Sequence, residues 1–158
     1  MKMNAVIICE SVHHGNTLKV AEAIAGVLGV EIVKPADVDL RALSGYDLLG
    51  FGSGVYYMRH HKNILNLADQ LAPSEFTRSF IFSTSGTGLP VFHAPLKKRL
   101  EKKGYSVAGE FTCPGWETLG PLKLFGGISK GRPNEEDLED AREFAKGLKP
   151  ETTISEEI

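Results

Sequence analysis

Small polar residues and a glycine stand where an apolar run gives way to a helical pattern. Residues 3–9 are typical of a buried strand, and apolar residues recur at helical spacing over residues 18–28. The strand-to-helix turn between them would point unpaired amides and the positive end of a helix at a ligand, which favours an anion. Gly15 permits a backbone geometry that a side chain would block. The turn therefore indicates a phosphate site, or else an ordinary helix start capped by Asn16 or Thr17.

The groups available to a phosphate come from one short run of the chain. Hydroxyl, amide and imidazole side chains can donate hydrogen bonds to phosphate oxygens, and so can backbone amides at a helix start. The predicted phosphate-binding residues are Ser11, His13, His14, Gly15, Asn16 and Thr17.

Two later loops carry aromatic and small residues. Residues 54–59 bring two tyrosines beside a glycine, and residues 85–92 bring small polar residues, glycines and Phe92. A flat, apolar, redox-active ring with a phosphate tail would use all three loops, because a tyrosine can stack on such a ring. The alternative for the tyrosine pair is that one packs in the core and the other covers the next helix. The predicted ring-binding residues are Ser53, Gly54, Val55, Tyr56, Tyr57, Ser85, Gly86, Thr87 and Gly88.

Strand and helix patterns alternate along the whole chain. Strands are predicted over residues 3–9, 30–34, 46–53, 78–84 and 105–113, and helices over 16–28, 60–71, 94–103 and from 135 onward. This alternation predicts a doubly wound, three-layer αβα sandwich whose five-stranded parallel sheet has the order 2-1-3-4-5. The ligand should then lie over the loops that follow strands one, three and four. We expect one domain over residues 1–149 and a polar tail over 150–158.

Composition excludes several classes of function. The chain has 158 residues and a net charge of -2, and its basic residues are dispersed, so we expect no nucleic-acid partner. No apolar run reaches the length of a membrane span and the start of the chain does not resemble a signal peptide, which predicts a cytoplasmic protein without a membrane partner. Cys9 and Cys113 each end a predicted strand and are expected to be buried thiols.

The run SVHHGNT at residues 11–17 resembles the phosphate loop of the flavodoxins, whose pattern is Ser/Thr-x-Thr-Gly-x-Thr. Gly15, Asn16 and Thr17 match that pattern directly, whereas His14 stands in place of its middle threonine. The order of predicted elements agrees with the family as far as Leu148. The segments GSGVYYMRHHKNI and GWETLGPLKLFGGISKGRPNEEDLEDAREFA look closer to flavodoxin-domain proteins of anaerobic bacteria and archaea than to the named electron carriers.

The resemblance implies non-covalent FMN, transfer of one or two electrons, and a ring held by the loops after strands three and four. We therefore expect an FMN-binding electron carrier whose redox partner is a protein of unknown identity, present as a monomer or homodimer. No residue is singled out as catalytic, since the flavin would carry the chemistry. The alternatives are an FMN-dependent NAD(P)H:quinone or protoporphyrinogen-type oxidoreductase, and a cofactor-free interaction module with the same fold.

Other sites of doubly wound proteins fit the sequence less well. All five histidines are predicted at one end of the sheet, but the adjacent His-His pairs lack the i, i+4 spacing of a helical metal motif, so we predict no metal. A phosphoacceptor domain would need an aspartate at the end of strand three, where this chain has Gly52-Ser53. A small tyrosine phosphatase would need an arginine at position 15. Trp116 lies in the long segment 114–133 and has two possible roles: it could cover the cofactor edge or pack on strand five.

Overall fold

The computed structural model describes residues 3–12, 14–116 and 126–150 of the chain. The strands of this part are β1 (Ala5–Glu10), β2 (Glu31–Val33), β3 (Leu48–Tyr56), β4 (Arg59–His60), β5 (Arg78–Ser85) and β6 (Ser106–Pro114). The α-helices are α1 (Asn16–Leu28), α2 (Lys62–Gln70), α3 (Ala94–Lys102) and α4 (Glu135–Leu148). Three short 3₁₀ turns complete the described elements: Pro35–Asp37, Ala42–Gly45 and Pro90–His93.

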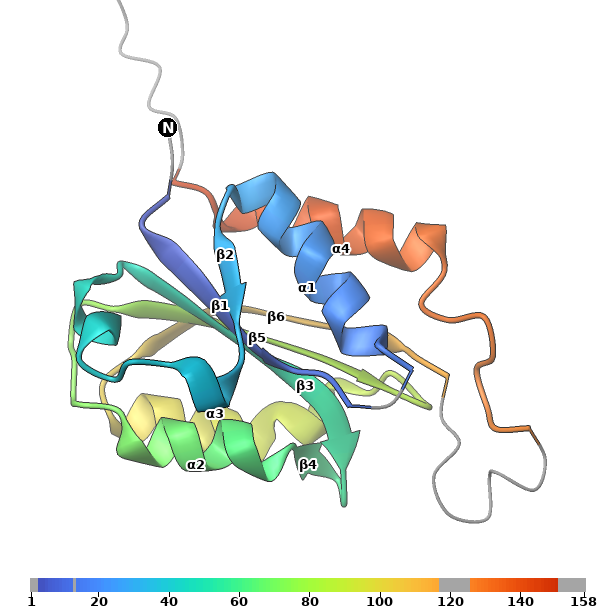
Figure 1. The fold of residues 1–158 in the computed structure, drawn as a ribbon, viewed down its shortest axis with the longest axis horizontal. Coiled ribbons are helices and arrows are strands. Elements are labelled where there is room, and N and C mark those ends of the chain that lie inside the picture. The colour runs from blue at the N-terminus through green and yellow to red at the C-terminus, as the bar shows by residue number, and fades with distance from the viewer. Residues whose placement is uncertain (1–2, 13, 117–125, 151–158) are drawn as a thin grey trace, which may run out of the picture.

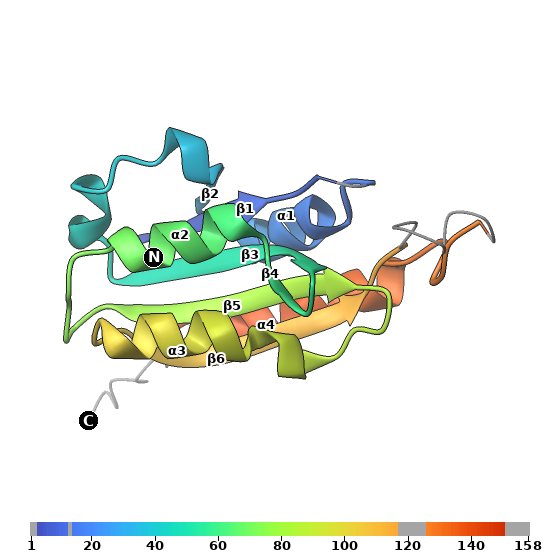
Figure 2. The same cartoon turned by 90° about the horizontal axis from the view of Figure 1, so that it is seen from below.

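Five of the strands form one parallel sheet in the order β2-β1-β3-β5-β6, with β4 paired antiparallel to the end of β3. Helices α1 and α4 cover one face and α2 and α3 cover the other, which gives three layers (Figures 1 and 2). Counted along the chain, the parallel strands have the order 2-1-3-4-5, so the predicted doubly wound topology is confirmed. The strand order reverses between β1 and β3, and the loops after these strands therefore diverge around a crevice.

Two apolar cores lie on the two faces of the sheet because successive strand residues point to opposite sides. On β1, Ile7 packs toward α1 and α4, and its neighbour Ile8 packs toward α2 and α3. No residue of β1 before Glu10 is exposed, which explains its nearly continuous apolar sequence. No helix in the described part of the chain is long and apolar enough to cross a membrane.

The helices begin and end at residues with clear conformational reasons. Gly29 closes α1 in the left-handed conformation (φ 69°), and its amide donates to the carbonyl oxygen of Ala25. Asn134 opens α4 with a capping box, because its side chain accepts from the amide of Asp137 and the Asp137 carboxylate accepts from the amide of Asn134. The predicted helix bounds, residues 16–28 and from 135 onward, agree with both ends.

The predicted loop over residues 54–59 is wrong, since β3 continues to Tyr56 and turns back into β4. Tyr56 and Arg59 are paired, and the two residues between them have positive φ angles of 51° (Tyr57) and 66° (Met58). Two positive φ angles are typical of the tight turn that matches the twist of a hairpin. Such turns usually contain glycine or asparagine, and this sequence has neither there. Helix α2 consequently starts at Lys62, two residues later than predicted.

Glycines in β3 make room for phenylalanine rings of β5. Gly50 and Gly52 lie beside Phe80 and Phe82 in the sheet, and a Cβ atom on either glycine would overlap the ring of its neighbour. The two rings are stacked, with their centroids 6.0 Å apart, and have no exposed surface. Alanine at either position would therefore overpack the core.

We expect Gly52→Ala to lower the free energy of unfolding by about 1–3 kcal/mol, because the Phe82 ring must move away. Gly26→Ala is the matched control, since Gly26 lies inside α1 with open space around its Cα and alanine favours a helix by about 1 kcal/mol. Urea unfolding followed by circular dichroism measures both. Equal effects of the two variants would contradict this account of β3.

Candidate functional site

A cleft opens at the carboxyl ends of the strands, where segments from β1, β3, β5 and β6 meet. Residues on its walls come from the first βα turn, the end of β3, the end of β5 and the segment after β6. They are Val12, Asn16, Thr17, Gly54, Val55, Tyr56, Thr84, Ser85, Gly115 and Trp116. The cleft thus lies at the reversal of strand order, where doubly wound proteins bind ligands.

The turn before α1 is built around Gly15. Its φ of 65° is left-handed, and a Cβ atom there would meet nothing within 4 Å, so the backbone angle and not crowding favours glycine. Gly15 is also the N-cap and gives the helix no side-chain cap, so α1 does not begin with a capping Asn16 or Thr17. The preceding residue, His14, is left-handed as well, with a φ of 57°.

The first amides of α1 point out of the helix without an intrahelical partner, as at every helix start. Ser11 Oγ accepts from the amide of Leu18 at 3.2 Å. Among the described residues, no acceptor is bonded to the amides of Asn16 and Thr17. The first turn also contains no acidic residue that would occupy this position. These two amides and the positive helix end can therefore bind an anion.

The side chains of Asn16 and Thr17 join this turn to other walls of the cleft. Asn16 Nδ2 donates to the carbonyl oxygen of Trp116 at 3.0 Å, and the hydroxyls of Thr17 and Thr84 lie 2.7 Å apart. Because each hydroxyl has one proton and two acceptor positions, Thr17 can still donate to a ligand when Thr84 donates to it. The Asn16 amide instead holds the segment after β6 against the turn, and a Cβ atom on Gly115 would strike it.

The two tyrosines of the second predicted loop have different positions. Tyr56 lines the cleft, and its ring meets the ring of His61 edge-on at 5.2 Å. Tyr57 is at the hairpin turn with 96% of its surface exposed, so it neither packs in the core nor covers α2. Ser53 is buried below them and accepts from the amide of His61 at 2.9 Å, which makes it a support of the hairpin.

The third predicted loop folds against the segment that follows β6. Ser85 Oγ accepts from the amide of Gly88, and Ser129 Oγ donates to the carbonyl oxygen of Gly86. Gly88 is left-handed, and a Cβ atom on it would come within 3.0 Å of Pro114. Only Ser85 of this loop lines the cleft, while the exposed Thr87 lies outside it. Gly86 and Gly88 instead determine the backbone path of the loop after β5.

The sequence leaves two roles open for Trp116, and in the structure this residue forms one wall of the cleft. Its ring stacks on His14 with centroids 4.0 Å apart, and its indole N–H donates to the carbonyl oxygen of Gly126. The Lys130 ammonium lies 5.6 Å from the ring centroid. Trp116 is one of the residues that line the cleft. The position of Trp116 could have been inferred from the topology, because the last parallel strand ends at the same edge of the sheet as the other parallel strands.

The histidines that suggested a metal do not converge in the described residues. Among these residues, no three His, Cys, Asp or Glu side chains gather closely enough to hold an ion, and His13 lies outside them. Cys9 and Cys113 are both buried, and burial raises the pKa of each thiol to about 12, so neither is a thiolate at neutral pH.

The fold and the glycine-containing turn at the strand-order reversal define a doubly wound α/β protein of the flavodoxin-like class. A family model described as a flavodoxin domain matches residues 6–115, and the chain belongs to this family. An uncharacterized protein of Methanocaldococcus jannaschii is 43% identical over 148 residues, which cover 92% of this chain and 98% of that protein.

Solved structures of two flavodoxins and of one further protein share the fold at low sequence identity. Oxidised flavodoxin 2 from Bacillus cereus superposes with a TM-score of 0.66 at 18% identity, covering 91% of this chain and 96% of that one. A flavodoxin from the domain Archaea has a TM-score of 0.62 at 16% identity, with coverages of 90% and 94%. The Trp repressor binding protein from Bacillus subtilis has a TM-score of 0.63 at 14% identity, with coverages of 92% and 97%.

A buried histidine below the cleft makes stability depend on pH. His60 is 1% exposed, its Nε2–H donates to the carbonyl oxygen of Phe82 at 2.9 Å, and no partner of its Nδ1 is present among the described residues. Burial is the main cause that lowers the pKa of His60 to about 3, against 6.5 for an ordinary histidine. The folded state therefore holds the ring neutral, whereas the unfolded chain protonates it below pH 6.5.

We expect the contribution of His60 to stability to be complete above pH 6.5 and to be lost as the pH falls toward 3. Between pH 6.5 and 5 the wild type should lose about 2 kcal/mol of unfolding free energy through this group alone. His60→Gln should be less stable than the wild type at pH 7 but should lose less on acidification. Urea unfolding at both pH values measures this, and parallel losses in the two proteins would refute it.

Proposed function

We propose that this protein binds FMN non-covalently and transfers electrons to or from another protein. The observation that carries the proposal is the start of α1: a left-handed Gly15 and the amides of Asn16 and Thr17, which have no acceptor among the described residues. They stand at the reversal of strand order in a chain of the flavodoxin domain family. A phosphate monoester supplies the charge and oxygen atoms that such a helix start binds.

The residues of the cleft fit the two parts of FMN. The phosphate would lie on the amides of Asn16 and Thr17, with the Ser11 and Thr17 hydroxyls as further donors. The ring would lie near the aromatic walls that Tyr56 and Trp116 supply, and Gly54 keeps the backbone beside it without a side chain. FMN, when bound, supplies one- or two-electron redox chemistry, and the chain supplies position and environment.

The surface around the two ring loops favours a protein partner. Tyr57 and Met58 at the hairpin turn and Leu89 and Val91 after β5 are all exposed apolar side chains. Exposed apolar groups that gather near a site are typical of interaction surfaces. The two unpaired, buried cysteines fit a reducing compartment, and we propose the cytoplasm as the location.

FMN titration of the purified apoprotein tests the proposal. We expect FMN fluorescence to be quenched as it enters the cleft, with one equivalent bound per chain. Asn16→Asp should weaken binding at least about tenfold, because it adds a negative charge at the positive helix end where the phosphate is bound. Asn66→Asp is the matched control, since it adds the same charge to an exposed position of α2 and should leave the affinity unchanged.

Two results of this experiment would count against the proposal. Unchanged FMN fluorescence at saturating protein would remove FMN as the cofactor. Equal weakening by the two aspartate variants would show that net charge, and not the start of α1, governs binding. Rapid reduction of the bound FMN by NADH or NADPH alone would favour the oxidoreductase alternative over an electron carrier.

A further inference from the structure

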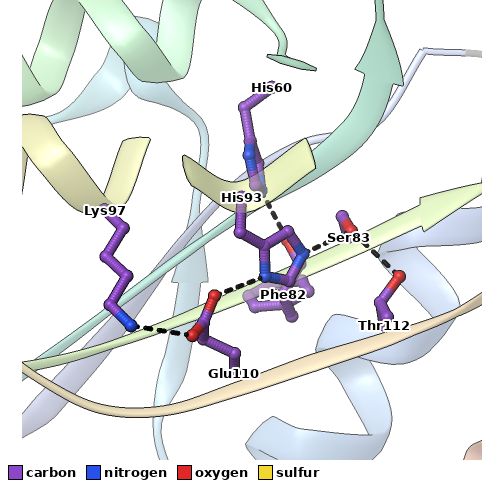
Figure 3. A network of polar contacts seen from close by, with 7 residues as sticks. All are labelled: His60, Phe82, Ser83, His93, Lys97, Glu110 and Thr112. Carbon is purple, nitrogen blue, oxygen red and sulfur yellow. Dashed lines mark hydrogen bonds and ion pairs between the residues drawn. The ribbon is translucent and has the colours of Figure 1, made fainter. Parts of the chain in front are cut away.

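A row of polar side chains, of which His93 and Ser83 are buried, lies on the α2 and α3 side of the sheet (Figure 3). The ring of His93 stands in its centre. His93 Nε2 is 2.6 Å from Ser83 Oγ, and His93 Nδ1 is 3.1 Å from Glu110 Oε1. The row continues from Ser83 to the Thr112 hydroxyl at 3.1 Å and from Glu110 to Lys97 Nζ at 3.3 Å. We call these five residues the His93 network.

The spacing of serine, histidine and carboxylate resembles that of a hydrolytic triad, but the serine is out of reach. Ser83 has no exposed surface and lies within β5, between β3 and β6. Its side chain points toward the layer of α2 and α3, so a substrate carbonyl cannot approach it without displacing the residues packed there, His93 among them. The His93 network must therefore do something that needs no direct contact with a substrate.

The His93 network can hold one more or one fewer proton, and the added proton completes its hydrogen bonds, because the single proton of the Ser83 hydroxyl cannot serve His93 Nε2 and Thr112 Oγ1 at once. The Glu110 carboxylate accepts from Nδ1–H of His93, so in the neutral ring Nε2 accepts the proton of the Ser83 hydroxyl. When Nε2 is protonated, it donates to Ser83 Oγ, and the Ser83 hydroxyl turns to donate to Thr112 Oγ1. Both arrangements use the same heavy-atom positions, so gaining a proton requires only the rotation of one hydroxyl.

Each segment of the network leads into a wall of the cleft. Ser83 comes two residues before Ser85 on β5, and Thr112 comes three residues before Gly115. His60, whose ring is 5.1 Å from that of His93, lies on the strand that pairs with the end of β3. Two residues of a strand span about 7 Å. The His93 network therefore lies directly below the loops after β3 and β5.

The charges facing His93 act on its protonation in opposite directions. Glu110 on β6 favours the charged ring, whereas Lys97 on α3 and burial disfavour it, and burial is the largest cause that lowers the pKa of His93. His60 on β4 is held neutral and adds no charge near pH 7. The Glu110 side chain is 30% exposed, so a proton from solvent can reach the network through it. A negative charge added in the cleft would shift this balance toward the protonated ring.

We propose that the His93 network is a proton-uptake site that responds to the charge of the ring in the cleft: His93 gains a proton from solvent when that ring becomes negatively charged on reduction. The inference rests on the proposed binding of FMN, with the ring between the loops after β3 and β5. Uptake places one proton on His93 Nε2 and turns the Ser83 hydroxyl to Thr112. Opposite unit charges about 10 Å apart at an effective dielectric constant of about 20 shift a pKa by about one unit.

Histidine NMR titrations test the coupling without measuring activity. Nitrogen-15 spectra of the side chains would be followed from pH 5 to 9 in the apoprotein, with oxidised FMN, and with FMN fully reduced under anaerobic conditions. We expect the His93 signal to titrate at a pH at least about one unit higher with reduced than with oxidised FMN, a tenfold change in proton affinity. The same difference should appear as a break in the midpoint potential against pH.

Variants distinguish uptake at His93 from a merely structural role. His93→Gln should remove the break in the potential, and Thr112→Val should lower the pH at which His93 titrates, because the turned hydroxyl loses its acceptor. Glu110→Gln should lower that pH further. Glu143→Gln on the surface of α4 removes the same charge far from His93 and should change nothing. If His93→Gln does not fold, the Thr112 and Glu110 variants carry the test.

The outcomes separate this inference from the proposed function. FMN that binds while His93 titrates at the same pH in both redox states would overturn proton uptake and leave FMN binding intact. A chain that takes up no FMN would overturn the proposed function and the coupling together. If Glu110→Gln and Glu143→Gln changed the pH at which His93 titrates by the same amount, the effect would be one of general charge. That result would also overturn the assignment to His93.

Discussion

The start of α1 is the constraint on which the site depends. A helix leaves its first amides without intrahelical partners, and β1 delivers this helix start to the carboxyl edge of a parallel sheet. Gly15 takes a left-handed conformation and offers no capping side chain, so the amides of Asn16 and Thr17 stay available. The missing side-chain cap costs helix stability and leaves the helix start open to a ligand.

The walls of the cleft are held together by contacts between residues far apart in the chain. Asn16 holds the backbone at Trp116, and Thr17 meets the hydroxyl of Thr84. These contacts tie the first βα turn to the ends of β6 and β5. The shape of the cleft is therefore a property of several strand ends at once, and a change in one of them will be felt at the others.

The two faces of the sheet are used differently near this edge. On the α1 and α4 side, Phe80 and Phe82 fill the space that Gly50 and Gly52 leave, and the core is apolar up to Thr84. On the α2 and α3 side, the apolar core stops at Ile81, and the next residue on that face is the buried Ser83. Placing polar groups in a buried layer is unfavourable unless they bond to one another, and those of the His93 network do.

Much of the fold could be predicted from the sequence because hydrophobic periodicity is local. The spacing over residues 16–28 gave the bounds of α1, and the apolar run before Gly52 indicated a strand covered on both faces. The hairpin at Tyr57 was missed, since its positive φ angles are imposed by strand pairing on residues that rarely adopt them. His60 was assigned to a helix start for the same reason.

The sequence by itself determined the order of elements, their alternation, and the glycine-containing turn that precedes α1. Only the tertiary structure decided that Trp116 stacks on His14, that Tyr56 and not Tyr57 lines the cleft, and that His93 stands between Ser83 and Glu110. The spacing of apolar residues along a segment indicates which face of its own helix or strand a residue occupies. Which elements then meet at a strand edge is fixed by sheet pairing and chain crossovers, and no short stretch of sequence contains that information.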